Sequence, residues 1–302
     1  MKKVLKWIGI LIGSVIVLLI LVGSIVYLVA GSKLNKTYQV QVRTIQIPSD
    51  EASIARGKHI IEAITPCQEC HGEDLSGEVM IDDPVFATIY SANLTPGKGG
   101  AGSSFTDEDW IRALRYGVTP EGKGLLIMPV EVTSNFSDQD LGALIAYLKT
   151  IPPVDHEIPP KRFGFMGRLF TVLGQIPPLA PDMVANHPVQ PEAVKQEATS
   201  AYGEYLISVA ACRDCHGVDL SGGTSTDPNG PPNGPNLTPA GELVGWTEAD
   251  FFKAIQTGIK PSGTQLTEDM PWKYYRNMTD DELKAIWMYL ETLPATQTSD
   301  SN

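Results

Sequence analysis

The feature that most constrains this chain is a five-residue motif, Cys-x-x-Cys-His, that occurs twice. The first copy runs from Cys67 to His71 and the second from Cys212 to His216, and together they use all four cysteines of the 302 residues. The spacing could also serve a thioredoxin-like redox pair or half of a zinc site. A redox pair has no need for the histidine, however, and neither copy has a partner cysteine cluster with which to build a zinc ribbon.

The motif is the attachment site of a c-type haem, so the sequence predicts two covalently bound haem c groups with their iron. Two intervening residues place the sulfurs one helical turn apart, where both can form thioethers with the haem. The following histidine then reaches the iron. The residues predicted to form thioethers are Cys67, Cys70, Cys212 and Cys215, and the first axial ligands are His71 and His216.

The N-terminus predicts a membrane anchor. Trp7 to Ala30 is a run of 24 residues without a charge, preceded by Lys2, Lys3 and Lys6. Such a helix is about 36 Å long, enough to cross a hydrocarbon core of about 30 Å. A cleaved signal peptide is the alternative, although its apolar region is usually shorter. Lysines before the run place the N-terminus in the cytoplasm. We therefore expect a single-pass protein of the bacterial cytoplasmic membrane, with its haem domains on the periplasmic side.

The remaining pattern is mainly α. Capping sequences at Thr106, Ser137, Thr247 and Thr279 start amphipathic helices, and helical spacing also precedes each haem motif, from Ser53 and around 198–210. Residues 72–104 and 118–136 read as loops. The expected segments are an anchor (1–31), a tether (32–50), a first domain (51–153), a Pro-rich linker with a short helix at 163–173 (154–196), a second domain (197–295) and a polar tail (296–302).

The two halves are copies of one unit. Cys212 follows Cys67 by 145 residues, Asn-Leu-Thr-Pro recurs at 93–96 and 236–239, and Met270 and Tyr289 follow Met128 and Tyr147 by 142 residues. Small differences in loop length explain the drift in offset. Two copies of this length indicate one domain used twice rather than a solenoid.

Each half resembles class I cytochrome c, through the haem motif, a Met-Pro loop, and a glycine in the first helix paired with a tyrosine in the last. The resemblance implies close helix crossings at Gly57 with Tyr147 and at Gly203 with Tyr289. It also implies that a backbone carbonyl accepts from the haem-ligating histidine, at Pro235 in the second half and Ala92 in the first. The Asn-Leu-Thr-Pro stretches and the Pro-rich connector resemble the multihaem cytochrome c subunits of bacterial membrane-bound alcohol, sorbitol and gluconate dehydrogenases, which commonly carry three haems where this chain has two motifs.

The sixth ligands are predicted to be Met128 and Met270. They lie 57 and 54 residues after their histidines, each is followed by proline, and each precedes the last helix of its half. A loop methionine more often fills a core, but the repetition favours ligation. Met80, His156 and Met278 are weaker candidates, His59 is expected on a solvent-exposed helix face, and His187 is expected in solvent. His/Met ligation leaves no open iron position, which favours electron transfer over catalysis.

We therefore expect a membrane-anchored dihaem cytochrome c that carries single electrons between extracytoplasmic respiratory or photosynthetic partners, with no catalytic residues and no small-molecule substrate. Beyond the three N-terminal lysines, 20 basic and 35 acidic side chains leave a charge of −15. That charge argues against nucleic acid and favours redox protein partners with a basic docking face. The alternatives are a dihaem cytochrome c peroxidase and a haem-wiring subunit of a membrane-bound dehydrogenase complex.

Overall fold

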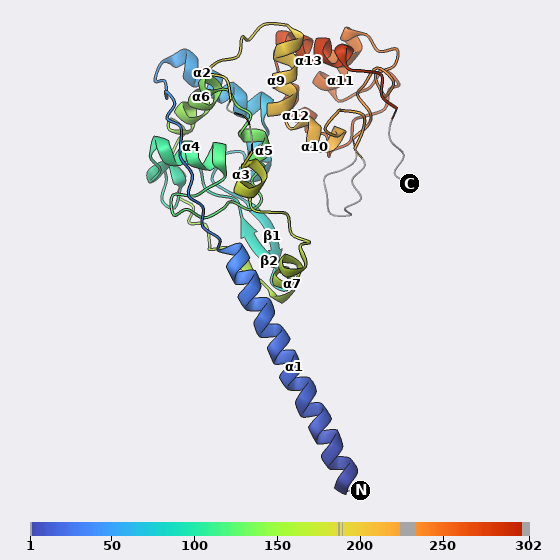
Figure 1. Cartoon of the computed structure of the whole chain (residues 1–302). Coiled ribbons are helices and arrows are strands. Elements are labelled where there is room, and N and C mark those ends of the chain that lie inside the picture. The colour runs from blue at the N-terminus through green and yellow to red at the C-terminus, as the bar shows by residue number, and fades with distance from the viewer. Residues whose placement is uncertain (1, 187, 189, 224–233, 298–302) are drawn as a thin grey trace.

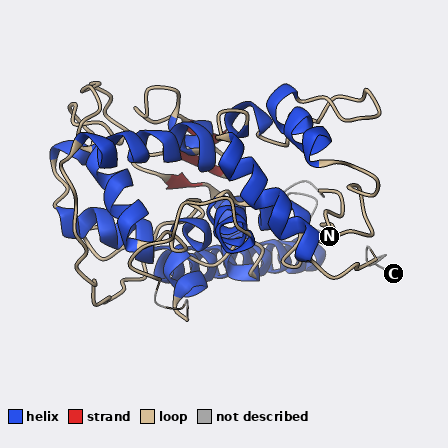
Figure 2. Cartoon of the chain, turned by 90° about the horizontal axis from the view of Figure 1, so that it is seen from above, coloured by secondary structure: helices blue, strands red, loops and turns tan. Residues whose placement is uncertain are grey.

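A computed structural model describes residues 2–186, 188, 190–223 and 234–297 of the chain. Figure 1 shows a long helix, α1 (Lys2–Leu34), extending from a globular head that is built mostly of short helices. Viewed from above in Figure 2, the head is helical with a few short strands, which agrees with the mainly α prediction. The α1 helix is the one helix among the described residues that is long and apolar enough to cross a membrane.

The first half of the head is organised by a crossing of its first and last helices. The first helix, α2, continues into a one-turn π-helix, η1, and then the motif helix α3; the last helix is α6. A Cβ added at Gly57 would lie 2.0 Å from the carbonyl oxygen of Ala143 and 2.8 Å from Tyr147 Cβ, so only glycine permits this approach. The helices of this half are α2 (Glu51–His59), η1 (Ile60–Ile64), α3 (Cys67–His71), η2 (Ala101–Ser103), α4 (Asp107–Tyr116), α5 (Val130–Thr133) and α6 (Asp138–Leu148).

The second half repeats this arrangement. Its first helix crosses its last, and a Cβ at Gly203 would lie 1.9 Å from the carbonyl oxygen of Ala285 and 2.9 Å from Tyr289 Cβ. Both glycine–tyrosine contacts that the resemblance implied are thus confirmed. The helices are α9 (Ser200–Val209), α10 (Cys212–His216), α11 (Glu248–Thr257), α12 (Trp272–Tyr275) and α13 (Asp280–Thr292).

Three of the predicted helix starts form a capping box, in which the Thr side chain accepts from the N3 backbone and the N3 carboxylate accepts from the Thr backbone. These are Thr106 with Asp109, Thr247 with Asp250, and Thr279 with Glu282. Both interactions are local, so the sequence alone specifies them. A single cluster of buried side chains then runs through both halves and includes Ile60, Phe136, Leu206 and Leu290.

The prediction that residues 72–104 form only a loop is wrong in part. They contain an antiparallel hairpin, β1 (Val79–Asp83) and β2 (Ala87–Tyr90), with an irregular register near Ile81. The short strand β3 (Arg162–Phe163) completes the sheet by pairing with β2. Since β3 comes from the Pro-rich segment, no local pattern announces this pairing.

The Pro-rich segment returns to the first half of the head. The Asn93 side chain donates to the carbonyls of Val154 (2.9 Å) and His156 (3.2 Å), which ties the start of the segment to the Asn-Leu-Thr-Pro loop. The predicted short helix exists as α7 (Phe165–Leu173), and it packs against both the hairpin and α1. A further helix, α8 (Ala180–Val184), packs against α5 and was not predicted.

Residues 32–50, which the sequence predicts to be a tether, do not run free of the head. The amide of Tyr38 donates to the Gly122 carbonyl at 2.8 Å, and a Cβ at Gly142 of α6 would meet the carbonyl oxygen of Gln46 at 2.4 Å. Residues 38–50 therefore lie against the first half of the head. They contribute Val42, Ile45 and Ile47 to the edge of the core, which explains their scattered β-branched residues.

Candidate haem-binding sites

Each Cys-x-x-Cys-His motif forms one short helix, α3 or α10, directly after the first helix of its half. Both motif helices end at a glycine with a positive φ, Gly72 (81°) and Gly217 (84°), a backbone conformation that favours glycine. The equivalent leucines Leu75 and Leu220 share a φ of 61° in the turn that follows. The two haem motifs thus have nearly the same backbone path.

Each motif histidine is oriented by a backbone carbonyl. His71 Nδ1 donates to Ala92 O at 2.7 Å, and His216 Nδ1 donates to Pro235 O at 2.8 Å. Both acceptors are the ones that the resemblance implied. A Cβ at Gly234 would lie 2.7 Å from His216 Nδ1, so this glycine allows the loop to reach the ring. With Nδ1 protonated, Nε2 is the nitrogen available to a metal.

The ionisation of the motif side chains fits haem attachment better than a redox pair. Burial lowers the pKa of His71 and His216, against a raising effect of their carbonyl partners, so both rings are neutral and can ligate iron. Burial raises the pKa of the Cys67 and Cys212 thiols to about 12. A redox pair needs accessible thiolate, whereas a thioether has no proton to lose.

Met128 and Met270 occupy equivalent half-buried positions at the edge of the core. Each is followed by a proline that starts a short helix, and in each the carbonyl of the methionine accepts from the residue after that proline, at 2.8 Å in the first half and 2.7 Å in the second. Met278 is buried beside the start of α13, with 5% of its surface exposed, while Met80 lies on β1. Among the weaker candidates, His156 Nδ1 donates to Ser76 O at 2.9 Å, and His187 lies outside the described residues.

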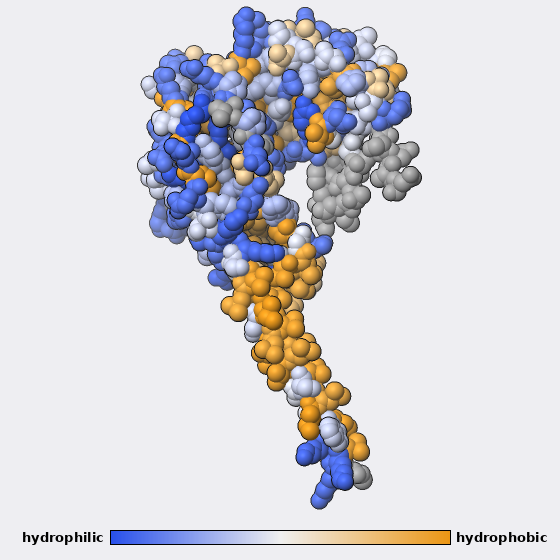
Figure 3. All heavy atoms as spheres, viewed as in Figure 1, coloured by the Kyte–Doolittle hydropathy of each residue, from blue (hydrophilic) through white to orange (hydrophobic). Residues whose placement is uncertain are grey.

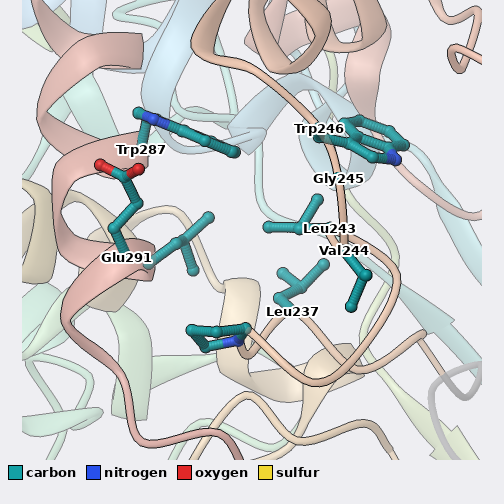
Figure 4. A pocket seen from close by; sticks show the side chains of 9 residues that line it. Leu237, Leu243, Val244, Gly245, Trp246, Trp287 and Glu291 are labelled. Carbon is teal, nitrogen blue, oxygen red and sulfur yellow. The ribbon is translucent and has the colours of Figure 1, made fainter.

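Two buried indole groups and one apolar pocket also suit a buried group with both apolar and acidic parts. Trp110 Nε1 and Trp272 Nε1 are buried without an acceptor among the described residues, and an indole N–H of this kind can donate to a carboxylate. Trp272 lies two residues after Met270. A pocket of about 230 Å³ opens between α13 and the loop after Pro235 (Figure 4). Its walls are mainly apolar and aromatic: Leu237, Pro239, Leu243, Trp246, Trp287 and Leu290. The residues therefore fit haem c.

The two motifs lie next to each other across the contact between the halves. Thr65, two residues before the first motif, donates through Oγ1 to Val209 O at 2.7 Å, three residues before the second motif. The Asn277 side chain of the second half donates to Glu62 O of the first half at 3.0 Å. The segments that carry the haems are thus in direct contact.

This contact has an approximate twofold relation, because the short helix after each Met-Pro pair faces the other half. Burial raises the pKa of Asp214, in the second motif, to about 6, and the charge of Glu131 on α5 adds to the effect. Burial likewise raises the pKa of Tyr274 on α12, with a further contribution from Glu69 in the first motif. Consistent with this, α5 contacts α9 and α12 contacts η1.

A buried ionic cluster joins the halves, and sequence reasoning missed it. Arg56 donates to both carboxylate oxygens of Asp140 at 3.0 Å, to Glu282 at 2.9 Å and to the Tyr202 hydroxyl at 3.2 Å. The carboxylates of Asp140 and Glu282 are only 3% and 5% exposed. The spacing of 142 residues between them, which is also the spacing of the Met-Pro loops, was the one signal available.

The expectation that His59 faces solvent is wrong. Its Nε2 donates to Glu282 Oε2 at 2.7 Å across the contact, and its side chain is 27% exposed. In the apolar pattern of this helix alone, position 59 falls on the face that points away from the core. Glu282, in the first turn of α13, reaches that face, which the helix pattern of a single segment does not reveal.

The fold and the paired haem motifs define the class: this is a chain of two tandem cytochrome c domains, each attaching one haem c, and it belongs with electron-transfer proteins rather than with catalytic enzymes. Family models agree. Residues 52–148 match the model described as cytochrome c oxidase, cbb3-type, subunit III, and residues 200–294 match the one described as cytochrome c.

The similarity of this chain to known proteins covers both of its domains. The fructose dehydrogenase cytochrome subunit of Gluconobacter japonicus is 28% identical over 80% of this chain and 53% of its own length. A dihaem cytochrome c-type protein of Cereibacter sphaeroides is 27% identical over 80% of this chain and 86% of its own length. The gluconate 2-dehydrogenase cytochrome c subunit of Pantoea cypripedii is 26% identical over 83% and 62%. The resemblance to dehydrogenase cytochrome subunits is confirmed, although the chain spans only about half the length of the first of these relatives.

Proposed function

We propose that this chain is a membrane-anchored dihaem cytochrome c that passes single electrons between extracytoplasmic redox partners. The observation that carries the proposal is the direct contact of two equivalent haem-attachment segments, in which Thr65, just before the first motif, donates to Val209, just before the second. An electron that enters one domain can therefore pass to the other domain and leave from there. A carrier of single electrons needs no substrate pocket.

We propose His71 with Met128, and His216 with Met270, as the axial ligands. When bound, each haem supplies a reversible one-electron couple. A thioether ligand favours the ferrous state and raises the reduction potential. The role of the chain is to keep both axial positions of each iron occupied. Carbonyls fix the imidazoles, and Pro129 and Pro271 begin the short helices that hold the methionine loops against the core.

We propose that α1 spans the membrane with the head on the periplasmic side. The helix is sufficiently long and apolar, and lysines precede its apolar part. The acidic excess of the chain supports partners with a basic docking face. A second candidate role, wiring electrons within a membrane-bound dehydrogenase complex, is supported by the relatives that are named as cytochrome subunits of fructose and gluconate dehydrogenases.

Single substitutions test the axial assignments. Met128→Ala and Met270→Ala should each remove about half of the ferric iron–sulfur charge-transfer band, because each removes one of two sulfur ligands. Met80→Ala, on the β1 strand, is the control and should leave the band unchanged. An unchanged band in either Met-Pro variant would reject that ligand, and loss of the band in Met278→Ala would transfer the role to Met278.

Two further measurements separate the roles. Purification in mild detergent tests the wiring role, because a stoichiometric dehydrogenase that remains bound would make the chain a complex subunit. A peroxide assay tests the dihaem peroxidase alternative. Two six-coordinate haems predict negligible turnover, and rapid turnover would overturn the carrier assignment.

A further inference from the structure

The helix α7 is attached to the last turns of α1 rather than to the haem domains alone. Val26 and Ala30 are the two buried residues of α1, 4% and 0% exposed, and they lie one turn apart on one face. Lys33 donates through Nζ to the carbonyls of Thr171 (3.3 Å) and Val172 (3.4 Å). The guanidinium of Arg168 lies 4.6 Å from the centre of the Tyr27 ring.

The position of these contacts along α1 fixes the height of α7 relative to a bilayer. From Trp7, where the uncharged run begins, 20 residues of helix cover about 30 Å and reach Tyr27. Tyrosine and tryptophan are typical of the two membrane interfaces. If Trp7 marks one interface, Tyr27 marks the other, and α7 lies at the level of the lipid headgroups.

The α7 helix also presents apolar side chains that the protein does not cover. Phe165 and Leu173, at its two ends, are 44% and 60% exposed, and Val85 in the neighbouring hairpin turn is 61% exposed. The opposite side of α7 is closely packed, since a Cβ at Gly167 would lie 2.2 Å from the Phe86 carbonyl oxygen. In Figure 3 the apolar surface of α1 continues without a break onto the foot of the head.

Basic side chains accompany this apolar surface. Lys33 and Arg168 have long aliphatic stems that can lie along apolar contacts while the charges reach the headgroups. Lys161 and Arg162 lie four and three residues before the start of α7. In a chain of net charge −12, this local group of cations is suited to anionic phospholipid. Asp82 and Asp83 of the hairpin carry negative charges, which act against the attraction to anionic lipid.

From these observations we propose that α7 and the adjoining turn Asp83–Phe86 form a lipid-contact surface that lies in the headgroup region of the outer leaflet. The occupant of this surface is the phospholipid bilayer itself. Two attachments, α1 through the membrane and α7 on it, hold the head at a fixed tilt, so that the same faces of the haem domains always point away from the membrane. The inference rests on the proposed membrane span of α1.

Nitroxide labels on the full-length holoprotein test this surface in nanodiscs of phosphatidylcholine and phosphatidylglycerol. Labels are placed at Phe165→Cys and Leu173→Cys, with Ile259→Cys as the matched control, because Ile259 is an exposed apolar residue of the second domain at 43%. A label at Ile16→Cys, in the middle of α1, reports the span itself. Collision with oxygen, which concentrates in lipid, is compared with collision with a water-soluble nickel chelate.

We expect the labels at positions 165 and 173 to collide several-fold less with the chelate than the label at 259 does, while oxygen collisions stay high. Chelate collisions equal to those at 259 would overturn the proposal, and so would protection from both reagents, which would indicate protein contact. The label at 16 distinguishes the two levels of inference. If it collides freely with the chelate, the span fails and α7 fails with it, whereas a lipid-embedded label at 16 with water-exposed labels at 165 and 173 rejects α7 alone.

Discussion

Replacing Arg56 by methionine tests whether the buried ionic cluster holds the two cytochrome domains together. Burial lowers the pKa of Arg56, but the hydrogen bond and charge of Asp140 more than reverse the effect, so the guanidinium stays charged. In Arg56→Met the carboxylates of Asp140 and Glu282 would remain buried without the guanidinium that joins them.

The expected loss of stability depends on the contacts that the two carboxylates keep in the variant. Removing one partner of a buried ion pair costs about 3–5 kcal/mol. Asp140 would keep the hydroxyl of Tyr205 at 2.8 Å, and Glu282 would keep His59 at 2.7 Å. We therefore expect the lower end, about 3 kcal/mol in the free energy of unfolding, and a melting temperature lower by roughly 10 °C.

The matched control is Lys98→Met, which removes the same charge from an exposed pair. Lys98 and Glu157 are 71% and 68% exposed, so this loss should stay below about 1 kcal/mol. Denaturant unfolding of the holoproteins, followed by circular dichroism, measures both. Hydrogen exchange should rise in η1 and α9 of the Arg56 variant and stay unchanged in α4. An Arg56→Met variant no less stable than Lys98→Met would refute the structural role of the cluster.

Three other predictions concern stability. The Gly203→Ala variant should be less stable to unfolding by about 3 kcal/mol, because its Cβ would lie 1.9 Å from a backbone oxygen that no rotamer change can move. The control is Gly31→Ala, which has open space around it and should lose no stability. Thermal melts compare the two variants. Burial raises the pKa of Glu282, but His59, the Thr279 amide and Arg56 together lower it from 4.5 to about 2. Its stabilisation, about 3 kcal/mol, is complete above pH 4.5 and is lost as the pH falls toward 2, and an acid titration in which Glu282→Gln keeps the same dependence would contradict this. Finally, a Cys212→Ala/Cys215→Ala variant should fail to fold its second domain for lack of haem, and native helicity there by circular dichroism would disprove that dependence.

What the sequence could predict was local or repeated. The helix starts at Thr106, Thr247 and Thr279 are specified within four residues, and the structure has all three capping boxes. The haem motifs are equally local, and the repeat brought Met128 and Met270 together as a pair. The His71 and His216 carbonyl partners were available only through a resemblance to a known family, and both are present.

What the sequence could not predict depends on segments far apart in the chain. The β1–β2 hairpin lacks a strong turn signal and is completed by β3 from the Pro-rich segment. His59 was assigned to solvent because its partner, Glu282, is 223 residues away. The N3 position of Glu282 was recognised as a helix cap, but one carboxylate both caps α13 and pairs across the contact. Periodicity within one helix does not contain the second role.

Carbon monoxide binding to the fully reduced protein tests the central claim, that both haems are six-coordinate electron carriers, most directly. With His71 and Met128 on one iron and His216 and Met270 on the other, neither haem has an open position, so the account predicts no change in the ferrous absorption spectrum under carbon monoxide. Rapid stoichiometric binding at either haem would contradict it, because that haem would then be open to a substrate.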